Sequence, residues 1–75
     1  MIVVYGKPKC NYCDMAKQLL DAKGIDFKYI DVEEDDDALA FIVSSGYKTV
    51  PQIFEGDKHI GGFTELDHYI KHIRM

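Results

Sequence analysis

Cys10 and Cys13 are the only cysteines of the chain, and two residues separate them. A cysteine thiolate is the attacking group in thiol–disulfide exchange, and a second cysteine three residues on can close a disulfide with it. Such a bond closes too short a loop to constrain much of the unfolded chain, so a structural staple explains the pair poorly. The spacing therefore predicts a redox-active dithiol.

The pair lies where a strand is expected to pass into a helix. Residues 2–5 form an apolar run that predicts a buried strand, and a helical pattern starts near Cys13. A cysteine at a helix N-terminus faces unpaired N–H groups and the positive end of the helix dipole, which favour the thiolate. Lys7 and Lys9 add cationic charge nearby. We therefore expect Cys10 to attack, and Cys13, on the inner side of the first turn, to resolve the mixed disulfide.

A zinc site is the main alternative for the cysteines. His68 and His72 stand four residues apart on an expected helix, so both halves of a two-cysteine, two-histidine pattern are present. The stretch from Cys13 to His68 is far longer than the roughly 12–15 residues of a zinc finger. We therefore expect no metal site, and interpret the histidine pair as a solvated helix face.

The remaining pattern predicts the elements that hold the pair in place. The first strand precedes a helix that ends at Gly24, a strand at 27–31, a helix that follows the acidic residues 31–37 and ends at 44–46, and a hairpin at 51–60 that turns at residues 56–57. The order β-α-β-α-β-β-α predicts an α/β fold, with a four-stranded mixed sheet and three helices. We expect a single domain over residues 1–75.

The last helix is expected after Gly61-Gly62. Thr64 and Asp67 have the spacing of a weak capping box. The expected inward face of this helix carries four apolar residues, Leu66, Tyr69, Ile70 and Ile73. In the acidic run 31–37 we expect a solvated helix start, because the alternating spacing and central glycine of a calcium loop are missing.

Composition narrows the class of protein. A hydrophobic share of 47% favours an ordinary globular chain, and a net charge of −4 argues against a nucleic-acid partner. The longest apolar run, 38–43, is too short to cross a bilayer, and residues 1–5 lack the features of a secretory signal. We therefore expect a cytoplasmic protein without membrane contact, whose cysteines are kept reducible.

Three further motifs accompany the cysteine pair in a fixed order. They are Val4-Tyr5-Gly6-Lys7-Pro8, Thr49-Val50-Pro51-Gln52-Ile53-Phe54 and His59-Ile60-Gly61-Gly62. With these motifs the chain resembles the dithiol glutaredoxins along essentially its whole length, and most of all the small glutaredoxins of tailed bacteriophages. The resemblance implies a thioredoxin-like fold and a monomeric, glutathione-dependent thiol–disulfide oxidoreductase. It also implies reduction of protein disulfides and glutathione mixed disulfides, with ribonucleotide reductase as one expected acceptor.

The resemblance also implies where glutathione binds. Lys7 is expected to pair with the glycine carboxylate, and Tyr12 to flank the bound tripeptide. Thr49 precedes Val50, whose backbone would pair with glutathione as a short strand does, next to a cis peptide bond at Pro51.

At the other end of glutathione, Gly62, Phe63 and Thr64 are expected to bind the γ-glutamyl carboxylate through backbone N–H groups. Many members of the family have a small residue followed by aspartate where this chain has Phe63-Thr64. The γ-glutamyl ammonium group therefore loses a carboxylate partner, for which Glu65 or Asp67 could substitute.

Two departures from the family pattern leave alternatives open. Asn11 follows the first cysteine, where the family commonly has proline. Glutaredoxins without that proline sometimes bridge a 2Fe-2S cluster between two subunits, which makes an iron–sulfur carrier one alternative. The Phe63 departure favours another alternative, a glutaredoxin-like redoxin that thioredoxin reductase reduces.

Overall fold

The computed structural model describes residues 1–73. Its elements are β1 (Ile2–Gly6), α1 (Asn11–Ala22), β2 (Phe27–Asp31), α2 (Asp36–Ser44), β3 (Gln52–Glu55), β4 (Lys58–Gly61) and α3 (Phe63–His72). The predicted order of strands and helices is therefore confirmed. The strands form one mixed sheet in the order β2-β1-β3-β4, in which β1 pairs parallel with β2 and antiparallel with β3.

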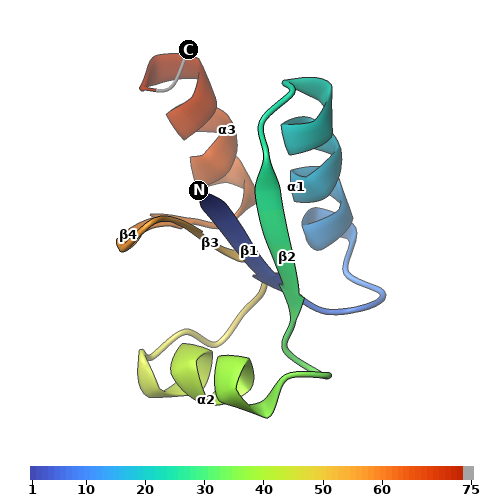
Figure 1. Cartoon of the computed structure of the whole chain (residues 1–75), viewed down its shortest axis with the longest axis vertical. Coiled ribbons are helices and arrows are strands. Elements are labelled where there is room, and N and C mark those ends of the chain that lie inside the picture. The colour runs from blue at the N-terminus through green and yellow to red at the C-terminus, as the bar shows by residue number, and fades with distance from the viewer. Residues whose placement is uncertain (74–75) are drawn as a thin grey trace.

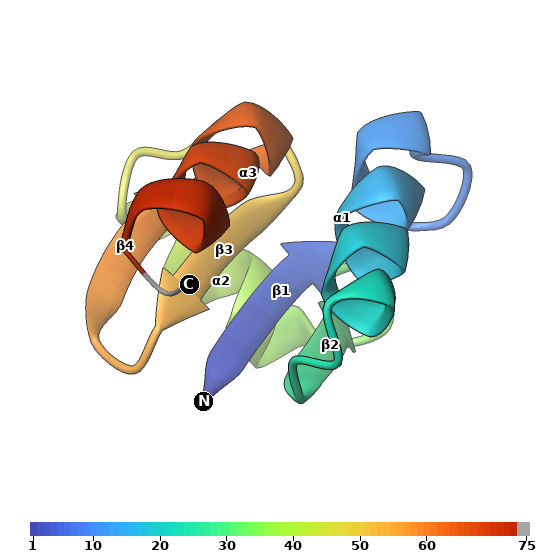
Figure 2. The same ribbon diagram turned by 90° about the horizontal axis from the view of Figure 1, so that it is seen from above.

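The helices cover both faces of the sheet. Figures 1 and 2 show α1 and α3 side by side on one face and α2 on the opposite face. The larger core lies under α1 and α3 and consists of Ile2, Val4, Ala16, Leu20, Ile53, Leu66 and Ile70. The smaller core lies against α2 and consists of Val32, Ala38, Ile42 and Phe54. In residues 1–73, no helix combines the length and the apolar character that crossing a membrane requires.

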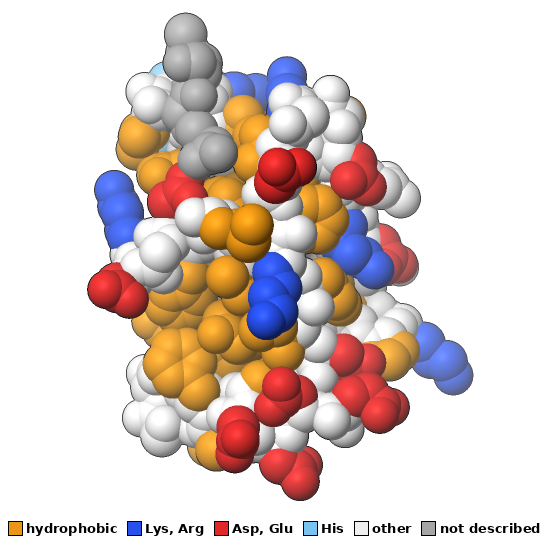
Figure 3. Space-filling model, in the orientation of Figure 1, with side chains coloured by type: hydrophobic (Ala, Val, Ile, Leu, Met, Phe, Trp, Pro, Cys, Tyr) orange, Lys and Arg blue, Asp and Glu red, His pale blue; other side chains and the backbone are white. Residues whose placement is uncertain are grey.

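The end of the acidic run begins α2, as predicted, whereas Asp31 belongs to β2 and Glu33 and Glu34 lie in the turn between them. Asp35 is the N-cap residue, and its Oδ1 accepts a hydrogen bond of 3.0 Å from the N–H of Ala38. Asp36 and Asp37 lie in the first turn, where the helix dipole favours negative charge. Figure 3 shows acidic side chains gathered on the surface at the bottom of the view, where Figure 1 places α2.

The start of α3 differs from the prediction. The helix begins at Phe63 with Gly62 as the N-cap residue, so the expected capping box of Thr64 and Asp67 is wrong. Glu65 fills the capping role instead, because its Oε1 accepts a hydrogen bond of 2.8 Å from the N–H of Gly62. The second glycine of the pair therefore belongs to the helix start rather than to a separate turn.

The inward face of α3 is shorter than predicted. Leu66 and Ile70 are buried and Tyr69 is half-buried, but Ile73 is 60% exposed. The helix ends at His72, and the backbone of Ile73 leaves the helical path with φ −120° and ψ −43°. Ile73 therefore falls outside the stripe that faces the sheet.

Candidate active site

Cys10 and Cys13 form a disulfide at the N-terminus of α1. Cys10 is the N-cap residue, and its Sγ accepts a hydrogen bond of 3.2 Å from the N–H of Cys13. The Cys13 side chain is fully buried, whereas Cys10 is half-buried. A substrate can therefore approach only the Cys10 sulfur, which also lies next to the backbone N–H groups that stabilise a thiolate.

The loop before β3 lies against this sulfur. The Val50–Pro51 peptide bond is cis, as the resemblance implies, and the Val50 carbonyl oxygen lies 3.9 Å from Cys10 Sγ. A Cβ added to Gly62 would lie 3.6 Å from the Pro51 carbonyl oxygen, so the start of α3 adjoins the same loop. Three segments far apart in the sequence thus meet at one end of the sheet.

A cavity of about 350 Å³ opens on the α3 side of the disulfide. It is lined by Tyr12, Thr49, Val50, Pro51, Phe63, Thr64 and Glu65. The rings of Tyr12 and Phe63 flank it, with their centroids 6.2 Å apart. Phe63 and Thr64 are the first two residues of α3, so their N–H groups have no intrahelical acceptor and suit a carboxylate.

Each acidic residue at the start of α3 already has one partner within the chain. The Glu65 carboxylate already accepts the N–H of Gly62, and the Asp67 carboxylate forms an ion pair of 3.1 Å with Lys71. Glu65 also lines the cavity, whereas Asp67 does not, and the pairing of either carboxylate with a ligand ammonium group stays a prediction.

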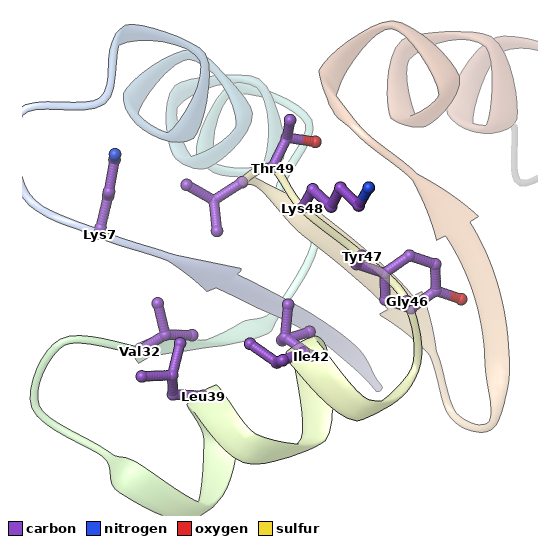
Figure 4. Close-up of a pocket in the computed structure, with 10 residues that line it drawn as sticks. Lys7, Val32, Leu39, Ile42, Gly46, Tyr47, Lys48 and Thr49 are labelled. Atoms are coloured by element: carbon purple, nitrogen blue, oxygen red, sulfur yellow. The ribbon is translucent and has the colours of Figure 1, made fainter.

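Lys7 lies in the segment between β1 and α1 (Figure 4). It lines a groove of about 550 Å³, which it shares with Thr49 and Val50. The Tyr29 hydroxyl donates a hydrogen bond of 3.3 Å to the Lys7 carbonyl oxygen. Burial, together with the nearby carboxylates of Asp31 and Asp14, raises the pKa of Tyr29, so this donor stays protonated.

One network near the site was not predicted from the sequence. Gln52 is only 7% exposed, and its Nε2 donates to the Thr49 carbonyl oxygen at 2.9 Å. Its Oε1 lies 2.7 Å from His59 Nε2, and the His59 ring stacks on Tyr47 with centroids 4.4 Å apart. The network ties the loop that carries Val50 to β4. Its only signal in the sequence is a glutamine directly before the apolar residues Ile53 and Phe54.

Replacing Gln52 by methionine should loosen this loop. The variant keeps the side-chain volume but leaves the Thr49 carbonyl and His59 without their partner, so we expect a loss of about 1–3 kcal/mol in unfolding free energy. The KM for a disulfide substrate should rise severalfold, while kcat stays within about twofold because the hydrogen bond from the Cys13 N–H to Cys10 Sγ is not touched by the substitution. Urea unfolding and steady-state kinetics measure both effects. An unchanged KM in a destabilised variant would limit Gln52 to a structural role.

The histidine pair lies far from the cysteines in the sequence and on a different helix. His68 and His72 belong to α3, and their ring centroids are 4.3 Å apart. Among residues 1–73, no group of three or more His, Cys, Asp or Glu side chains is placed to hold a metal ion.

Comparison with known proteins identifies the family. The glutaredoxin family model matches residues 2–60. The chain is 45% identical over 67 residues to a glutaredoxin of Neisseria meningitidis, covering 87% of this chain and 79% of that protein. It is also 44% identical over 68 residues to the hybrid peroxiredoxin hyPrx5 of Haemophilus influenzae, covering 91% of this chain but only 28% of that longer protein.

Solved structures agree with this assignment. A buckwheat glutaredoxin–glutathione complex superposes with a TM-score of 0.78 at 32% identity, over 93% of this chain and 67% of that chain. NrdH-redoxin from Escherichia coli, described as a glutaredoxin-like protein with a thioredoxin-like activity profile, gives a TM-score of 0.79 at 26% identity, over 85% of this chain and 84% of that chain. With its cysteine pair at the start of α1, the chain belongs to the glutaredoxin family of thiol–disulfide oxidoreductases.

Proposed function

We propose that the chain is a glutathione-dependent oxidoreductase that reduces protein disulfides and glutathione mixed disulfides. The observation that carries the proposal is the presence of two anion-binding features near one accessible sulfur. Lys7 lines one groove, Phe63 and Thr64 line a second cavity, and both are also lined by Val50, whose carbonyl oxygen lies 3.9 Å from Cys10 Sγ. Glutathione has a carboxylate at each end and its thiol in the middle, so it matches this arrangement.

The chemistry follows from the unequal exposure of the two cysteines. The Cys10 thiolate attacks one sulfur of a substrate disulfide, that S–S bond breaks, and the departing thiolate takes a proton from solvent. For a protein disulfide, the Cys13 thiolate then attacks Cys10 Sγ and releases the second substrate thiol. Two glutathione molecules reduce the resulting Cys10–Cys13 disulfide and leave as glutathione disulfide. For a glutathione mixed disulfide, glutathione alone resolves the intermediate at Cys10.

The binding residues divide between the groove beside Lys7 and the smaller cavity beside α3. Lys7 would hold the glycine carboxylate, and the backbone of Val50, 3.9 Å from Cys10 Sγ, would align the cysteine of glutathione. Tyr12 and Phe63 would flank the γ-glutamyl arm in the smaller cavity. We propose that the protein acts as a monomer in a reducing cytoplasm, with ribonucleotide reductase as one acceptor that the family resemblance implies.

A redoxin that thioredoxin reductase reduces is the second candidate. It is favoured by the start of α3, where Phe63-Thr64 stands in place of the small residue and aspartate of many family members, and where Glu65 and Asp67 each already have a partner in the chain. The likeness to NrdH-redoxin, with its thioredoxin-like activity profile, points the same way.

Supplying each reductant in turn separates the two candidates. We expect glutathione with glutathione reductase and NADPH to support disulfide reduction at least about tenfold faster than thioredoxin reductase with NADPH, since the two carboxylates of glutathione find partners here. Oxidation of NADPH in the presence of an insulin disulfide measures both rates. Turnover with thioredoxin reductase alone would replace the first proposal by the second.

A further inference from the structure

The groove beside Lys7 extends well beyond the disulfide. It lies between α2 and the loop of residues 46–50, and Figure 4 shows Val32, Leu39 and Ile42 on one side and Thr49 on the other. Val50 lines it and also contacts Cys10 Sγ through its carbonyl oxygen at 3.9 Å. A chain segment attached to a sulfur at Cys10 can therefore run directly into this groove.

The α2 wall of the groove is apolar and exposed. Leu39 is 44% exposed and Val43 is 62% exposed, and the two stand four residues apart on one face of the helix. Neither belongs to the two hydrophobic cores, so the fold does not need them there. An exposed aliphatic pair beside a reactive disulfide suits a hydrophobic substrate group.

The groove also carries positive charge in an acidic protein. Lys7 and Lys48 both line it (Figure 4), and neither forms an ion pair with any residue in the range 1–73. The chain as a whole has a net charge of −4, whereas the charged residues among those that line the groove are these two lysines. Their charge complements an anionic segment.

Glutathione leaves much of this groove unused. The residue after its cysteine is glycine, which has no side chain to contact Leu39 or Val43, and its one carboxylate at this end is matched by Lys7. We propose that the groove is a specificity site for protein substrates, and that it takes a large aliphatic residue directly after the reactive cysteine, followed by an acidic residue near Lys48. The order of residues in the segment rests on the proposed function, in which the glycine end of glutathione, and hence the residues after the reactive cysteine, lies in this groove.

A single-turnover reaction tests this proposal without glutathione. The protein is reduced with dithiothreitol, desalted, and mixed with the disulfide-linked dimer of a short blocked peptide. The Cys10 thiolate attacks one peptide sulfur and releases one peptide thiol. Cys13 then releases the second peptide thiol and leaves the Cys10–Cys13 disulfide. Acid quenching, alkylation and mass spectrometry give the second-order rate constant.

Four peptides define the preference. They contain cysteine-leucine-glutamate, cysteine-glycine-glutamate, cysteine-leucine-glutamine, and the reversed order glutamate-leucine-cysteine. We expect the first to react about five- to tenfold faster than the glycine peptide, because an open groove buries part of the leucine side chain. It should react about two- to threefold faster than the glutamine peptide, because the ion pair between its glutamate and Lys48 would be exposed to solvent and therefore weak. The reversed peptide should be as slow as the glycine peptide.

Glutamine variants of the α2 wall then test whether Leu39 and Val43 cause the preference for the leucine peptide. In the double variant Leu39→Gln/Val43→Gln the leucine and glycine peptides should react equally fast, at the rate that the unmodified protein shows with the glycine peptide. Met15→Gln is the matched control, because Met15 is 41% exposed on α1 and does not line the groove. Lys48→Gln should bring the glutamate peptide to the rate of the glutamine peptide.

Each result bears on the groove alone. Equal rates for the leucine and glycine peptides with the unmodified protein would overturn the proposal, as would a reversed peptide that reacts as fast as the first. A leucine preference that persists in the double variant would overturn it too. None of these results depends on the reductant, so a failure of the glutathione proposal leaves them interpretable.

Discussion

Replacing Cys10 by serine should abolish reduction of every disulfide substrate, whereas Cys13→Ser should abolish only the reduction of protein disulfides. A serine hydroxyl is neither ionised at neutral pH nor able to form a mixed disulfide, so we expect Cys10→Ser to lose at least about a thousandfold in kcat/KM. Cys13→Ser keeps the attacking sulfur and the backbone N–H that stabilises it, 3.2 Å away. It should retain deglutathionylation within about fivefold of the unmodified protein.

Two assays on the same preparations measure this division. One follows NADPH oxidation with a glutathionylated peptide, and the other follows reduction of an insulin disulfide, both with glutathione and glutathione reductase. Thermal unfolding of the two variants under reducing conditions is the control, since serine replaces a thiol of similar size at each position. Equal losses in both assays for Cys13→Ser would show that glutathione cannot resolve the intermediate at Cys10. Activity in Cys10→Ser would remove this residue as the nucleophile.

The sequence predicted most of what depends on local pattern. The β1-α1-β2 unit, the acidic start of α2 and the hairpin follow from periodicity, capping and turn residues, and the structure contains them. The position of Cys10 at a helix N-terminus follows from the same reasoning. The cis bond at Pro51 followed from resemblance to a family, because local sequence leaves trans the default.

Other features depend on contacts that no local pattern encodes. Glu65, not Asp67, completes the cap of α3, because the path of the chain through Gly61 sets where the helix begins. Gln52 and His59 pair across the β3–β4 hairpin, and their effect on Thr49 appears only when all three are placed. The groove needs Lys7, α2 and the loop of residues 46–50 to come together from three parts of the chain.

Gly61 is a residue whose replacement should strongly disturb the start of α3. Its φ is +129°, a conformation that residues with a side chain rarely adopt. A Cβ added there would lie 2.8 Å from Glu65 Cβ and 2.7 Å from Glu65 Cγ, so the helix itself would have to shift. Gly61→Ala therefore combines backbone strain with a steric overlap at the residue that caps α3.

We expect Gly61→Ala to lower the unfolding free energy by about 3–4 kcal/mol, and the thermal midpoint by roughly 10–20 °C for a domain of this size. Gly24→Ala is the matched control, because Gly24 also has positive φ, at +67°, but has no atom within 4 Å of an added Cβ. It should lose only about 1–2 kcal/mol, the cost of a left-handed conformation alone. Urea unfolding of both variants measures the difference.

The same variant tests how α3 serves the active site. If the start of α3 shifts, the N–H groups of Phe63 and Thr64 move away from the cavity beside Cys10. At a temperature where Gly61→Ala is still folded, the KM for a glutathionylated peptide should therefore rise by about tenfold or more, whereas Gly24→Ala should keep the KM of the unmodified protein. Equal stability losses in the two variants would mean that the Glu65 side chain moves away from the added Cβ without a shift of the helix. An unchanged KM in Gly61→Ala would mean that the N-terminus of α3 does not bind the substrate carboxylate.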